Sequence, residues 1–152
     1  MVGEKKPNTQ RDAIHYALNT TLGQVIRANV SFGLRIARDA KERSQSAPGN
    51  WGMDQYDRYF DKGIEAYIWF GHYLPHIRYL DKEYTESKLD DLSRRDANDA
   101  EWQAFMEGYL IGAAVYDDIY ALPAMRKNYE KAITNTAFDK KEDSSLVHHI
   151  TI

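Results

Sequence analysis

Two histidines four residues apart are the first candidates for chemistry in this sequence. His72 and His76 would present their imidazoles on one face of a helix, where paired nitrogen ligands can bind a metal ion. Pro75 lies between them, however, and no carboxylate is placed beside them by its position in the chain. Hydrogen bonding or contact with solvent is therefore the favoured interpretation. The two histidines remain weak metal candidates, and we expect no cofactor.

Carboxylates supply the other candidates for chemistry. Glu107 and Asp118 share one side of the helix expected at 98–121 and could form an acid–base pair, although an exposed edge is the favoured interpretation. No Glu is followed three residues later by His, as di-iron bundles require, and Gly-x-Ser-x-Gly and phosphate-loop motifs are absent. The sequence therefore predicts no catalytic residue. A ligand- or metal-binding bundle would use these residues together with Glu65.

Trp69 is the residue whose surroundings most suggest binding. It falls opposite the apolar face of the helix expected at 53–74, where the neighbouring positions are polar. An aromatic side chain among charged ones is typical of a protein interface. In the alternative interpretation, Trp69 packs under a loop or under the charged segment 81–97. The residues predicted to bind a partner are Trp69, Tyr59, Tyr73, Arg58, Lys62 and His72.

Helices must position these side chains. Hydrophobic periodicity predicts an all-α, single-domain helical bundle over residues 1–152, with a long first helix and a flexible or strand-like C-terminal tail. The expected helices are 9–43, 53–74, 98–121 and 123–137. The remaining segments are a disordered start at 1–8, a loop at 44–52, a charged connector at 81–97 with room for a short helix, and the tail at 139–152.

The predicted first helix carries a broad apolar surface. Its main stripe consists of Ile14, Leu18, Leu22, Val25, Phe32, Ile36 and Ala40, and a second group that widens it consists of Ile26, Val30, Leu34 and Ala37. About 34 residues would span roughly 50 Å, which is long for a domain of this size. We therefore expect a kink near Gly23 or Gly33, or an end that projects into a partner.

Glycines mark where helices approach one another. Gly63 and Gly71 fall on the predicted buried face of 53–74, and Gly108 and Gly112 form a Gly-x-x-x-Gly pair in the next helix. Glycine lets another backbone come close, which offsets its cost of up to about 1 kcal/mol in a helix. Residues 108–116 are apolar all round, so the helix at 98–121 is expected to be the central element.

Charge and composition limit the classes of protein. The 152-residue chain has a net charge of −3 and no cysteine. Residues 1–50 are basic and residues 51–120 are acidic; these regions either neutralise each other in the fold or across subunits, or leave an acidic face that mimics nucleic acid. No apolar run approaches the roughly 20 residues of a membrane-spanning helix. We expect a cytoplasmic protein without a membrane partner.

The leading hypothesis is a non-enzymatic protein-interaction module. Such a module would be an adaptor, an inhibitor or an assembly subunit, in one version of viral or mobile-element origin, and would bind another protein or a second copy of itself. Nucleic acid is an unfavoured partner because the net charge is negative. The alternatives are the ligand- or metal-binding bundle and an acidic nucleic-acid mimic or regulator.

Overall fold

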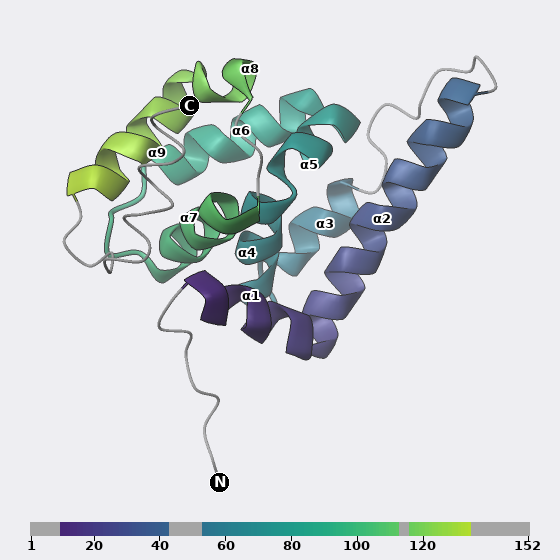
Figure 1. The fold of residues 1–152 in the computed structure, drawn as a ribbon, viewed down its shortest axis with the longest axis horizontal. Helices are drawn as coiled ribbons and strands as arrows, with labels where there is room; N and C mark the ends of the chain where they lie inside the picture. Colours follow the sequence, from purple (N-terminus) through teal and green to yellow (C-terminus); the bar gives the residue numbers. More distant parts are fainter. Residues whose placement is uncertain (1–9, 43–52, 113–115, 135–152) are drawn as a thin grey trace, which may run out of the picture.

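The computed structural model describes residues 10–42, 53–112 and 116–134 (Figure 1). All regular elements in these ranges are helices, which confirms the predicted all-α class. They are α1 (Gln10–Asn19), α2 (Thr21–Glu42), α3 (Met53–Tyr59), α4 (Glu65–His72), α5 (Leu74–Leu80), α6 (Lys82–Ser93), α7 (Ala100–Gly112), α8 (Asp117–Tyr120) and α9 (Pro123–Thr134). The predicted start at 1–8, the loop at 44–52 and the tail at 139–152 lie outside the described residues.

The predicted first helix is divided at Thr20 into α1 and α2, which diverge at a sharp angle (Figure 1). The Thr20 hydroxyl accepts a hydrogen bond from the N–H of Gly23 at 3.0 Å, as the residue before a helix commonly does. A Cβ atom at position 23 would lie 1.7 Å from the carbonyl oxygen of Ala17. The bend therefore needs a glycine, and it occurs close to the position predicted from Gly23.

The predicted helix at 53–74 is likewise divided, into α3 and α4, by a turn at 60–64. Pro75 belongs to the first turn of α5, where its missing N–H removes no helical hydrogen bond. The chain therefore bends between His72 and Leu74 and continues as another helix. These two breaks change which residues share a face, so the expected face of 53–74 does not exist as one surface.

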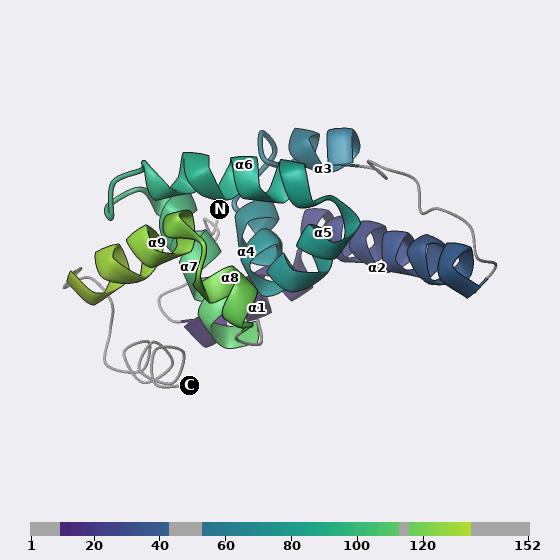
Figure 2. The same cartoon turned by 90° about the horizontal axis from the view of Figure 1, so that it is seen from above.

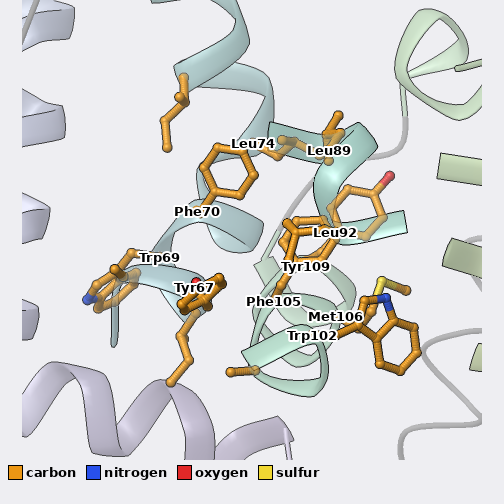
Figure 3. Close-up of a cluster of buried hydrophobic side chains, with 14 of the residues drawn as sticks. Tyr67, Trp69, Phe70, Leu74, Leu89, Leu92, Trp102, Phe105, Met106 and Tyr109 are labelled. Carbon is orange, nitrogen blue, oxygen red and sulfur yellow. The ribbon is translucent and has the colours of Figure 1, made fainter. Parts of the chain in front are cut away.

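The centre of the molecule is the contact between α4 and α7. A Cβ atom at Gly71 would lie 2.1 Å from the carbonyl oxygen of Phe105, and one at Gly108 would lie 2.0 Å from that of Ile68. The two backbones therefore touch, as predicted for Gly71 and Gly108. Figure 3 shows the aromatic side chains around this contact, where the Phe70 and Phe105 rings are 5.7 Å apart.

The remaining helices cover this central pair. Figure 2 shows α3 and α6 along one side of the molecule and α1 and α8 along the other, with α4 and α7 between them. One core cluster draws buried side chains from most of these helices. The prediction that 98–121 is the central element is confirmed for α7. Its predicted length is wrong, because Tyr116 has an extended backbone and a separate helix, α8, begins at Asp117.

The charged connector predicted at 81–97 is a packed helix over most of its length. Asp81 caps α6 by accepting a hydrogen bond from the N–H of Tyr84, and Leu89 and Leu92 are fully buried. At the other end of α6, the Lys131 ammonium of α9 donates to the carbonyl oxygens of Leu92, Ser93 and Arg95 at 3.4, 3.0 and 2.5 Å. These two apolar side chains and this lysine help to hold the helix on the core.

Candidate interaction surface

Trp69 is not on a polar face: its side chain is 2% exposed. Every residue of α4 from Glu65 to Gly71 is buried, because α1, α2, α5 and α7 all contact this helix. The prediction of polar surroundings for Trp69 is therefore wrong. Its physical cause is the turn at 60–64, which separates the polar residues of α3 from the helix that carries Trp69.

The other residues predicted around Trp69 lie in different environments. Tyr59 is buried with its ring 5.8 Å from that of Tyr56. Tyr73 is half-buried and its hydroxyl accepts a hydrogen bond from Arg27 Nε at 3.3 Å. Arg58 and Lys62 are exposed on α3 and on the turn that follows it. The predicted partner-binding residues therefore do not form one surface.

His72 and His76 are separated by the break between α4 and α5. The ring of Tyr73 lies beside both, with centroids 4.7 Å from His72 and 5.9 Å from His76. Burial lowers the pKa of His72, and the nearby Arg27 and His76 lower this pKa further. In the described part of the chain, no group of three or more His, Asp or Glu side chains is arranged to hold a metal ion.

Two buried ring nitrogens at this break lack a hydrogen-bond partner among the described residues. They are Nε1 of Trp69 and Nδ1 of His72, whose rings are 5.2 Å apart in an edge-to-face arrangement. A buried polar atom without a partner lowers stability unless water or another group reaches it. These two nitrogens therefore do not help to orient the rings, which pack edge to face.

The three candidate carboxylates do not meet. Glu65 is buried in the first turn of α4, where a negative charge is favourable, and accepts a hydrogen bond from the Thr20 hydroxyl at 3.3 Å. Asp118 forms an ion pair with Arg78 at 2.7 Å. Glu107 is half-buried on α7, and the helix break before α8 removes the polar strip predicted to join it to Asp118.

The exposed apolar residues of α2 form a feature that periodicity assigned to the core. Val25 and Phe32 are 46% and 57% exposed, whereas Ile26 and Val30 are fully buried. The second apolar group of the predicted first helix is thus its core face, and part of the main stripe faces outward. The two groups lie only about 100° apart on the helix, so sequence could not decide between them.

Next to this apolar strip, α2 carries a basic face. Arg27, Arg35, Arg38 and Lys41 are all exposed and lie within about 120° of the helix circumference. Arg35, Arg38 and Lys41 form no ion pair with another described residue. The carboxylates of the acidic region pair instead with Arg78, Arg94 and Arg95. The expected neutralisation of α2 within the fold is therefore not found in the described ranges.

The position of α2 makes these faces accessible. Figures 1 and 2 show its C-terminal half extending past the ends of α3 and α5. A pocket of about 360 Å³ opens where α2, α5 and α8 meet. Its apolar lining is Leu34, Pro75, Tyr79, Tyr116 and Ile119, and its polar lining is His76, Arg78 and Asp118. We name the basic face and this pocket together the α2 surface.

The comparisons with known proteins give no relative. The chain matches no family model, and neither the curated proteins nor the solved structures contain a chain similar to it. None of the described helices is long and apolar enough to cross a membrane.

Proposed function

We propose that this protein is an interaction module that binds another protein, or a second copy of itself, through the α2 surface. Its role is that of an adaptor, an inhibitor or an assembly subunit, without catalysis, and its place is the cytoplasm, where a chain without cysteine is at no disadvantage. This proposal replaces the surface predicted around Trp69 with one that is exposed.

One observation carries the proposal. The helix α2 extends beyond the body of the molecule, and its Arg35, Arg38 and Lys41 form no ion pair with another residue in the described ranges. Val25 and Phe32 are exposed apolar side chains on the side of the helix next to Arg35. Arginine and aromatic residues are enriched at the centres of protein interfaces. A helix that presents both, outside the core, is suited to contact with a second protein.

Site-specific photo-crosslinking in the native host tests this proposal. A photoreactive benzoylphenylalanine placed at Arg35 should give a discrete covalent adduct with one protein, because Arg35 is exposed on the proposed interface. The matched control carries the same group at Lys127, which is exposed on α9. An adduct of twice the chain mass would identify self-association. No adduct at Arg35, or identical adducts at both positions, would contradict the proposal.

A further inference from the structure

We infer that the partner is an acidic protein segment with one bulky uncharged apolar side chain, which fills the pocket between α2, α5 and α8 while its carboxylates bind Arg38 and Lys41. This inference rests on the proposed interaction function and names the chemistry of the partner. It joins two parts of the α2 surface, the pocket and the basic face, into one site.

The pocket has the size and lining of an anchor site. Its volume of about 360 Å³ lies at the low end of the roughly 300–1,000 Å³ range of ligand pockets and is enough to receive one large side chain. Leu34, Pro75 and Ile119 supply aliphatic contacts, and Ile119 belongs to the core cluster, so the floor is fixed. Tyr79 and Tyr116, 65% and 48% exposed, form the outer walls.

Arg78 and Asp118, two of the three polar residues that line the pocket, are already paired. Arg78 forms ion pairs with Glu86 at 3.0 Å and with Asp118 at 2.7 Å. The second oxygen of Asp118 accepts a hydrogen bond from the N–H of Ile119 at 3.0 Å. Because the guanidinium is compensated from two sides, a charged anchor would have to displace an existing ion pair. An uncharged anchor leaves these pairs intact.

The adjacent turns of α2 supply the charge. Leu34 lines the pocket, and Arg38 and Lys41 follow it on the same side of the helix, about 6 Å and 10 Å further along the axis. Both cations are exposed and form no ion pair with another described residue. A peptide anchored beside Leu34 can therefore place carboxylates two to three residues away against both of them.

The opposite rim of the pocket has the reverse charge. Asp117 is exposed on α8 beside the Asp118–Arg78 ion pair, so carboxylates of the partner are repelled there and attracted at α2. The partner segment is consequently oriented, with its acidic residues on one side of the anchor only.

Calorimetric titration with synthetic peptides tests the inference. The parent peptide has three Asp or Glu residues on one side of a single Phe and Gly or Ser on the other. One control peptide replaces Phe by Ala, and another replaces the carboxylates by amides. We expect the parent peptide to bind about tenfold or more tighter than either control, and its binding to weaken between about 50 and 200 mM salt.

Variants of the protein assign the two halves of the site. The double variant Arg38→Glu/Lys41→Glu should lose the parent peptide, whereas Lys127→Glu on α9 should not. Tyr116→Ala, at an exposed wall, should weaken the Phe peptide about tenfold and leave the Ala peptide unaffected. All four substituted positions are exposed, so we expect each variant to fold, and circular dichroism checks this.

Three outcomes would overturn the inference. The first is equal binding of the three peptides, or binding of none. The second is loss of the parent peptide on Lys127→Glu to the same degree. The third is binding of single-stranded oligothymidylate that is lost on substitution of Arg38 and Lys41 but not of Tyr116. That result would show that the basic face binds the phosphates of a nucleic acid. A crosslink at Arg35 without peptide binding would refute this inference alone, and absence of both would refute the proposed function as well.

Discussion

His72 is held where protonation lowers the stability of the fold. Its ring is half-buried between Trp69 and Tyr73, and its pKa is lowered from 6.5 by burial, and further by Arg27 and His76. A histidine of this kind binds its proton more tightly in the unfolded chain than in the folded one. Well above pH 6.5 it is neutral in both states and contributes nothing to the pH dependence of stability.

The free energy of unfolding should therefore fall as the pH decreases from about 7.5 to 5.5, through the unfolded pKa toward the folded one. His72→Gln and His72→Leu remove the titrating group, so each variant should lose less stability over this window than the native chain. Urea denaturation at both pH values measures the difference. The two variants differ in polarity, and the same reduced pH dependence in both would assign the effect to charge. A native dependence no steeper than that of the variants would contradict the prediction.

Helix packing in this protein depends on two glycines in different helices. Gly71→Ala and Gly108→Ala would each direct a Cβ atom at a backbone carbonyl of the opposite helix, at 2.1 and 2.0 Å. Backbone atoms cannot move aside as flexible side chains can, so the loss of stability should exceed about 2 kcal/mol for either substitution. Thermal or urea unfolding measures it.

Gly63→Ala is the matched control for these substitutions. The atoms that its Cβ would approach most closely are the Glu65 carboxylate at 2.9 Å and the Leu22 side chain at 3.1 Å, both ends of flexible side chains. The loss should be clearly smaller than at Gly71 or Gly108. Equal effects at the three positions would show that helix separation does not limit the packing of α4 on α7.

Lys131 links α9 to the end of α6. Its ammonium donates to the carbonyl oxygens of Leu92, Ser93 and Arg95 at the C-terminal end of α6 and lies 5.0 Å above the ring of Trp102. Lys131→Met keeps the apolar stem but removes these charged hydrogen bonds, and should cost about 2 kcal/mol of unfolding free energy. Lys127→Met, at an exposed position of the same helix, should change stability by less than about 0.5 kcal/mol. Similar losses in both variants would show that the carbonyl contacts add nothing.

Helical periodicity predicted most of the helical segments, but not all the breaks between them. The break at Thr20 lies close to Gly23, and the break at Tyr73 lies one residue from the predicted helix end, so both were anticipated. The turn at 60–64 and the extended backbone of Tyr116 fall inside apolar-periodic stretches and were missed, because such breaks depend on how the helices pack against one another.

Glycine positions were more informative, because a missing Cβ has a direct steric meaning. The close approach at Gly71 and Gly108 was predicted correctly, whereas Gly63, predicted on the same buried helix face as Gly71, lies in the turn at 60–64.

At the scale of the whole molecule, the sequence could not show which side of a helix faces the core and which faces solvent. Trp69 was placed on a surface because its helical neighbours included Arg58 and Lys62, which in fact belong to α3 and the turn. Val25 and Phe32 were placed in the core because a broad apolar stripe has two edges and only one faces the body. Both errors concern how a helix is placed among the other helices, and the hydrophobic periodicity of that helix alone does not reveal this.

The arrangement of α4 and α7 also determines the order in which backbone amides exchange their hydrogen for deuterium. Where two helix backbones touch, as at Gly71 and Gly108, solvent reaches an N–H only when the whole centre opens, so these helices should exchange last. The projecting half of α2 can fray by itself and should exchange first. A mass-spectrometric exchange time course would thus divide the molecule into a slow centre and a fast arm. A bound partner would slow the arm without changing the rate of the centre.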